Sequence, residues 1–149
     1  MNATDTAFVM VCSALVLVMT PGLAIFYGGL TRSKNVLSTM MHSFFLMGLA
    51  SVIWLVYGYS LAFGPDVGGV IGNLTHFMGA GVGTGVREGT TIPETVFLTF
   101  QGMFVIITPA LISGAFAERM KFSAFVVFSV LWITVVYAPV CHWVWGGGW

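Results

Sequence analysis

Aromatic side chains at helical spacing are the residues whose chemistry is most specific in this sequence. Phe97, Phe100 and Phe104 recur at intervals of three and four residues, so a helix would carry them on one face. Trp145 lies near the end of another apolar stretch, at the level where that face would begin. A ring face attracts a small cation by about 0.5 to 2 kcal/mol. From spacing alone, an aromatic belt with apolar packing is the simpler interpretation.

The histidines are weaker candidates. His42 lies inside an apolar stretch, where an ionisable group suggests function, although a lone polar residue is more often a hydrogen-bonded part of the structure. His142 precedes Trp143 and Trp145 near the end of its stretch, at a depth typical of an amphipathic belt. We therefore assign it no proton transfer.

No enzyme site is indicated. The carboxylates fall in connections or at the ends of apolar stretches, and no Ser, His and Asp come together by spacing. Cys12 and Cys141 lie far apart, without the C-x-x-C spacing of a metal or redox site. We expect no catalytic residues, no metal site and no cofactor.

Composition points to lipid. Of the 149 residues, 58% are hydrophobic and 7% are charged, whereas soluble domains carry about 25% charged residues. Five Lys and Arg balance five Asp and Glu, so no basic field exists to attract nucleic acid.

The uncharged runs between the charges predict an all-α polytopic membrane fold. A membrane span needs about 20 mostly apolar residues. Four stretches qualify, namely residues 7–30, 36–63, 93–116 and 122–144. Pro21 and Pro109 are expected to break the first and third helices, where the freed carbonyls must find partners within the protein.

Basic residues predict the orientation. Arg32 and Lys34 follow the first span, and Arg119 and Lys121 follow the third. Short connections rich in Lys and Arg stay in the cytoplasm, so both turns are expected inside. The N-terminus, the loop of residues 64–92 and the C-terminal end are then expected outside.

Several motifs together resemble one membrane protein family. They are PGLAIFYGGL (21–30) with KNVL (34–37), YGYSLAF (57–63), FQGMF (100–104) with GAFAER (114–119), and YAPVCHWVWGGG (137–148). In this order they resemble the Amt branch of the ammonium transporter family (Amt/Mep/Rh). The likeness extends over nearly the whole chain.

The resemblance implies a fold and an assembly. Members of the family are homotrimers, and each subunit has its own pore built by about eleven helices in two inverted halves. Residues 1–149 would form the N-terminal part of one such domain, supplying roughly the first four helices. The family's vestibule aspartate, its paired pore histidines and the serine of its recruitment site match no residue here.

The resemblance also implies site residues. Phe100 and Phe104 match the stacked phenylalanines that close the pore, and Phe104 and Trp145 match residues of the cation recruitment site. Ile107 matches a residue of the apolar pore wall. The implied function is ammonium/ammonia transport across the plasma membrane, with cation recruitment at an aromatic outer vestibule followed by a hydrophobic pore.

Two other functions stay open. The same fold could be an ammonium sensor attached to a signalling domain, or a purely structural module of membrane helices. A P-II-type signal protein is a regulator that the resemblance suggests, and the lipid bilayer and ammonium/ammonia are the other expected partners.

Overall fold

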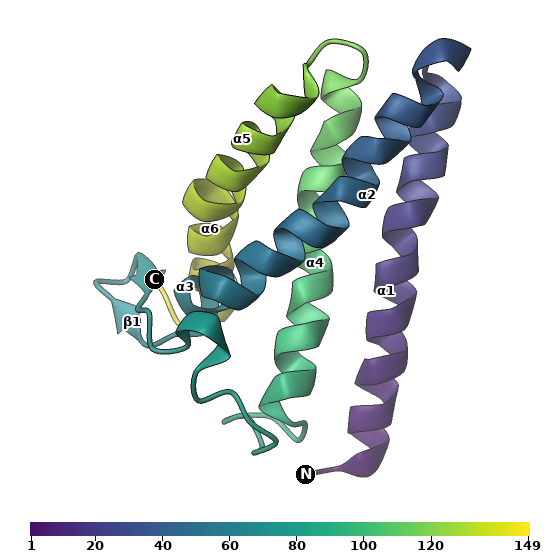
Figure 1. Cartoon of the computed structure of the whole chain (residues 1–149). Coiled ribbons are helices and arrows are strands. Elements are labelled where there is room, and N and C mark those ends of the chain that lie inside the picture. Colours follow the sequence, from purple (N-terminus) through teal and green to yellow (C-terminus); the bar gives the residue numbers. More distant parts are fainter.

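Four apolar helices form the structure, a computed structural model that describes residues 1–149. The helices long and apolar enough to cross a membrane are Ala3–Leu30, Ser33–Phe63, Glu94–Phe116 and Phe122–Trp145. They alternate in direction and pack as a bundle (Figure 1). The predicted all-α fold with four membrane helices is confirmed. Which end faces outward stays a prediction.

The two ends of the bundle differ. The N-terminus and the connection of residues 64–92 lie at one end, which we call the loop end (Figure 1). The short connections after the first and third membrane helices lie at the opposite end, which we call the turn end (Figure 1).

The first helix, α1 (Ala3–Leu30), begins earlier than residue 7 because its first turn is capped. The side-chain oxygen of Asn2 accepts hydrogen bonds from the backbone N–H groups of Thr4 and Asp5, at 3.0 and 3.5 Å. Such a cap satisfies donors that have no partner within a helix. The polar first turn is therefore helical although hydropathy does not mark it.

The expected breaks at the two prolines are wrong. α1 continues through Pro21, and α4 (Glu94–Phe116) continues through Pro109. Proline removes one N–H donor and displaces one carbonyl, while the other helical hydrogen bonds persist. Next to Pro109, the Thr108 hydroxyl donates to the Phe104 carbonyl at 2.6 Å. In lipid the remaining backbone groups have no water to bond instead, so the helix is preserved.

The irregular turns lie elsewhere, in the second and fourth membrane helices. The second consists of η1 (Ser33–Asn35), α2 (Val36–Ile53), the π-helical η2 (Trp54–Gly58) and α3 (Tyr59–Phe63); the fourth consists of α5 (Phe122–Trp132), the π-helical η4 (Ile133–Tyr137) and α6 (Ala138–Trp145). The hydroxyls of Tyr57 and Thr134 are 2.8 Å apart and join the two π-helical segments. π-helical turns occur frequently at functional sites.

The main core fills the space where α4 meets these two irregular helices. Its buried hydrophobic residues are Ala50, Ile53, Trp54, Tyr59, Ala62, Phe63, Val105, Ile106, Ile133, Tyr137 and Cys141. The Trp54 indole donates to the Leu98 carbonyl at 3.0 Å, so this large side chain is both packed and hydrogen-bonded. Nearer the turn end, the ring of His42 lies 4.6 Å from that of Phe125. His42 thus packs against a partner helix.

The connection at the loop end is tied to α3. Its strands β1 (Asp66–Val67) and β2 (Ile71–Gly72) pair antiparallel, and η3 (Phe77–Gly79) follows. Gly68 and Gly69 have φ values of 68° and 76°, which suit glycine in a tight turn. The Ser60 hydroxyl donates to the Asn73 carbonyl at 2.8 Å and accepts from the His76 N–H at 2.9 Å.

Glu118 joins the two connections at the turn end. Its carboxylate accepts from the Arg32 N–H at 2.8 Å and from the Asn35 side-chain amide at 3.0 Å. The Arg32 guanidinium adds an ion pair at 3.5 Å. These groups, first the Asn35 amide and then the Arg32 N–H, hold the pKa of Glu118 below its usual value. The two helix pairs are therefore fixed to each other at this end.

Candidate functional site

The aromatic residues of α4 divide into two groups. The rings of Phe100 and Phe104 pack edge to face, with centroids 5.0 Å apart and planes at 85°. Phe97 instead packs against Phe63, with centroids 5.0 Å apart, and lies 4.0 Å below the Arg87 guanidinium. The predicted common face is therefore split, and only Phe100 and Phe104 stack on each other.

Two cavities, of about 390 and 280 Å³, lie on different sides of α4. The smaller one, which we call the aromatic pocket, lies between α4 and the fourth membrane helix. It is lined by Phe104, Thr108, Trp132, Val136, Tyr137, Val140, Cys141, Val144 and Trp145.

The aromatic pocket brings together two of the residues matched by sequence motif. Phe104 from α4 and Trp145 from the end of α6 line the same cavity. Phe100 contacts Phe104 but does not itself line the cavity. Ile107 is 8% exposed and lies outside this lining.

The pocket provides aromatic rings and hydroxyls that could contact a cation, but it contains no opposite charge. None of its lining residues is Asp, Glu, Lys, Arg or His. The Thr108 hydroxyl is already bonded to the Phe104 carbonyl. The Tyr137 side chain is 9% exposed, and its hydroxyl has no hydrogen-bond partner. Leaving a buried hydroxyl unpaired costs about 1 to 3 kcal/mol, so a polar ligand that reached this oxygen would relieve that cost.

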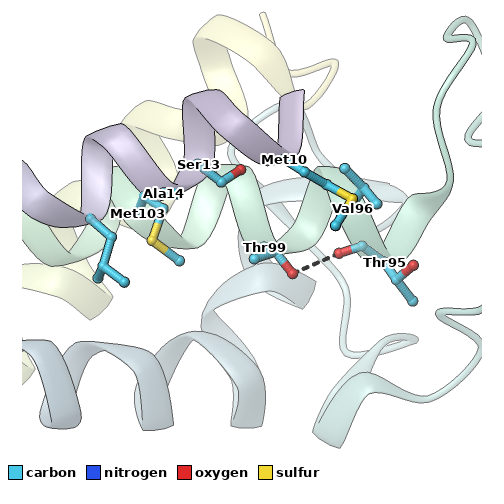
Figure 2. A pocket seen from close by; sticks show the side chains of 8 residues that line it. Met10, Ser13, Ala14, Thr95, Val96, Thr99 and Met103 are labelled. Carbon is cyan, nitrogen blue, oxygen red and sulfur yellow. Dashed lines mark hydrogen bonds between the residues drawn. The ribbon is translucent and has the colours of Figure 1, made fainter. Parts of the chain in front are cut away.

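The larger cavity, which we call the α1–α4 groove, has a different lining. Met10, Ser13, Ala14 and Leu17 of α1 face Thr95, Val96, Thr99 and Met103 of α4 (Figure 2). The Thr99 hydroxyl donates to the Thr95 carbonyl at 2.8 Å. No aromatic ring and no charge lines this groove. It therefore suits apolar chains better than a small cation.

A third arrangement, at the loop end, already contains a cation. The Arg87 guanidinium lies over the rings of Phe97 and Phe63, 4.0 and 5.0 Å from their centroids. It donates to the Tyr59 hydroxyl at 2.8 Å and lies 3.6 Å from the Glu94 carboxylate. These contacts fix the connection of residues 64–92 to α3 and α4.

Sequence reasoning missed Thr108, Trp132 and Tyr137 as parts of the pocket. Tyr137 and Trp145 stand in the same motif, two helical turns apart, and this spacing could have placed them on one face. Thr108 follows Phe104 by one turn in the same way. Trp132 carried no comparable signal.

The belt interpretation of His142 is wrong. Its side chain is fully buried, and both ring nitrogens have hydrogen-bond partners. Those partners belong to residues far away in the sequence, which no local pattern can reveal. No group of three or more His, Cys, Asp or Glu side chains is arranged to hold a metal ion.

Comparison with known proteins identifies the family. The model of the Ammonium Transporter Family matches residues 7–149. An ammonium transporter of Bacillus subtilis is 53% identical over 150 residues, which cover 100% of this chain and 37% of that protein. A crystal structure of Candida albicans Mep2 superposes with a TM-score of 0.89 at 34% identity, covering 98% of this chain and 32% of that chain. A structure titled Sensor Amt Protein shares the fold, with a TM-score of 0.85 at 24% identity.

The likeness covers nearly all of this chain but only part of each relative. The chain spans 37% of the Bacillus subtilis protein. The match nevertheless extends over every membrane helix described above, and the identity exceeds half. This chain therefore belongs to the ammonium transporter family.

Proposed function

We propose that this chain takes part in ammonium/ammonia transport, recruiting the ammonium cation at the aromatic pocket. The observation that carries the proposal is that Phe104 and Trp145, from two different membrane helices, line one cavity without a charged residue. The family is a transport family and not an enzyme family, and the chain is a multi-pass membrane protein.

The physical argument concerns how strongly such a pocket can hold a cation. Cation–π contacts contribute about 0.5 to 2 kcal/mol each, and more when water is excluded. Moving a bare ion into a medium like hydrocarbon costs tens of kcal/mol in the ideal limit. Rings can therefore concentrate and partly desolvate ammonium, but they cannot carry its charge through an apolar pore.

The transport path is therefore expected to consist of a recruitment site followed by an apolar pore. We propose that the Phe100 and Phe104 rings close the pore beneath the recruitment site and that Ile107 contributes to its apolar wall. The charged ammonium ion does not pass this gate, because the apolar pore wall provides no counter-ion. The proton and neutral ammonia then cross separately and recombine inside.

The whole protein's assembly belongs to the same proposal. We infer that residues 1–149 are the first part of one transporter domain, with the N-terminus and residues 64–92 outside. We also propose a homotrimer and regulation by a P-II-type protein, as the motif resemblance implies. An ammonium sensor on the same fold is the alternative, supported by the likeness in fold to the protein titled Sensor Amt Protein.

The test is uptake of ammonium or methylammonium by the protein expressed from its whole natural reading frame. Phe104→Ala and Trp145→Leu should each raise the half-saturating concentration roughly 2- to 30-fold, because each removes one ring worth about 0.5 to 2 kcal/mol. Phe128→Ala and Trp143→Leu are matched controls, since neither residue lines the pocket. Unchanged uptake and selectivity in both pocket variants would contradict the assignment.

The sensor alternative has its own readout. If the protein is a sensor, Phe104→Ala and Trp145→Leu should shift the ammonium concentration that triggers a cellular response, in cells whose uptake is unchanged by deleting the protein. A clear loss of uptake on deletion supports transport.

A further inference from the structure

His142 joins three parts of the loop end from a fully buried position near the end of α6. Its Nδ1 lies 2.9 Å from the Ala62 carbonyl at the end of α3. Its Nε2 lies 2.9 Å from the Asp66 carboxylate in β1. Asp66 also accepts the Gly69 N–H, at 3.0 and 2.9 Å from its two oxygens. The imidazole thus contacts the second membrane helix and the β1–β2 hairpin at once.

Counting donors determines the protonation state of this pair. A carbonyl oxygen only accepts, so Nδ1 of His142 must carry a proton. An ionised carboxylate also only accepts, so Nε2 must carry a second proton. The hydrogen bond from His142, followed by the Gly69 N–H, holds the pKa of Asp66 below its usual range, so its carboxylate is ionised at neutral pH. The pair is an imidazolium and a carboxylate.

The backbone after His142 is packed tightly around the same pair. The carbonyl of His142 accepts from the N–H of Gly146 at 2.9 Å and of Gly148 at 3.1 Å. A Cβ atom at Gly146 would collide with the Ala62 carbonyl, and one at Gly148 would lie 3.1 Å from Cδ2 of His142. Trp145 lies between His142 and Gly146, so its backbone has little freedom to move.

We propose that His142 and Asp66 are positioning residues whose ion pair fixes the end of α6 and thereby the place of the Trp145 indole at the aromatic pocket. This inference rests on the function proposed above. Neither residue lines the aromatic pocket, so neither contacts the recruited cation there. Their effect reaches the substrate through the end of α6, where Trp145 lines the pocket and is 62% exposed.

The pair depends on both ring protons, because an Nε2 without a proton would be an acceptor facing another acceptor, the Asp66 carboxylate oxygen. The other titratable or charged groups on the cavity that Asp66 lines are His76, Arg87, Glu88 and Glu94. Arg87 and Glu94 are already paired with each other, and His76 is bonded to the Ala80 carbonyl through Nδ1. Glu88 is exposed and does not bond to either member of the pair, which makes its carboxylate a suitable control.

The experiment compares Asp66→Ala, Asp66→Asn, Glu88→Ala and Trp145→Leu in the protein expressed from its whole natural reading frame. Asp66 is varied because it is 40% exposed and lies in the connection, so its loss disturbs folding less than the loss of buried His142. The measured quantities are the half-saturating concentration and the maximum rate of methylammonium uptake.

We expect Asp66→Ala to raise the half-saturating concentration roughly three- to tenfold, which is less than the rise expected for Trp145→Leu. The maximum rate of Asp66→Ala should stay within about twofold of wild type. Asp66→Asn should restore a value near wild type, because its amide can donate to a neutral imidazole.

Three outcomes overturn parts of the argument separately. An unchanged Asp66→Ala value beside a raised Trp145→Leu value overturns the positioning role and leaves the proposed function intact. Equal rises in Asp66→Ala and Glu88→Ala would assign the effect to lost negative charge and also overturn it. An unchanged Trp145→Leu value contradicts the proposed recruitment site itself.

Discussion

The two cavities beside α4 differ in chemistry more than in size. The α1–α4 groove has a volume of about 390 Å³ and the aromatic pocket about 280 Å³. The groove is lined by methionine, threonine, serine and aliphatic residues, whereas the pocket is lined by four aromatic residues, one of which, Tyr137, has a buried hydroxyl without a partner. The larger space is therefore the poorer candidate for a cation, because volume alone provides no attraction for charge.

The difference comes from α4 and from the helices that face it. Thr99 and Thr108 each donate to the carbonyl one turn earlier, at 2.8 and 2.6 Å, but only the pocket side of α4 carries a ring, that of Phe104. α1 presents Ser13 and Ala14 to one side (Figure 2), while the fourth membrane helix presents Trp145 to the other. α4 therefore has a packing face on one side and a candidate recognition face on the other.

The largest expected difference comes from filling each cavity. Val140→Trp adds an indole to the aromatic pocket and should lower the maximum uptake rate at least about tenfold, because it occupies the space proposed for the substrate. Ala14→Trp adds the same group to the α1–α4 groove and should leave the rate within about twofold. Uptake of labelled methylammonium measures both. A severe loss in Ala14→Trp with normal protein levels would show that the groove also serves transport.

A smaller effect is expected from removing the unpaired hydroxyl. Tyr137→Phe should raise the half-saturating concentration roughly 2- to 12-fold, as expected for the loss of one hydrogen bond of about 0.5 to 1.5 kcal/mol to the substrate. The free energy of unfolding should not fall, because no hydrogen bond within the protein is lost.

Tyr57→Phe is the matched control for this prediction. It removes the bond to Thr134 and should reduce the free energy of unfolding by about 0.5 to 1.5 kcal/mol while leaving the half-saturating concentration unchanged. If both tyrosine variants behave alike, the Tyr137 hydroxyl has no special contact with the substrate.

The smallest expected difference separates the two threonines. Thr108→Val should change the half-saturating concentration about two- to threefold, because its hydroxyl lies at the pocket but is already bonded to Phe104. Thr99→Val makes the same chemical change in the groove and should have no effect on uptake. A larger effect at Thr99 than at Thr108 would reverse the comparison of the two cavities.

The sequence predicted the membrane helices well, because hydropathy and charge act locally. A span must be long and apolar, and both properties can be read from consecutive residues. The errors were also local in origin. The capping by Asn2 extended α1, and Pro21 and Pro109 did not break their helices, since lipid offers the backbone no alternative to helical hydrogen bonds.

The candidate site was predicted only in part. Motif resemblance pointed to Phe104 and Trp145, and helical spacing could have added Tyr137. His142 was misjudged, because its partners Ala62 and Asp66 are 80 and 76 residues away. The pairing of Phe97 with Arg87 was missed for a different reason, because helical spacing does not show where a residue of an irregular connection will lie.

By itself the sequence determined that this chain forms four apolar helices, and its motifs indicated the ammonium transporter family. Only the tertiary structure decided which side of α4 faces the rings, which hydroxyl stays unpaired and which acid meets His142. The physical reason is that burial in lipid follows from each segment's own composition, whereas a site depends on contacts between residues that only packing brings together.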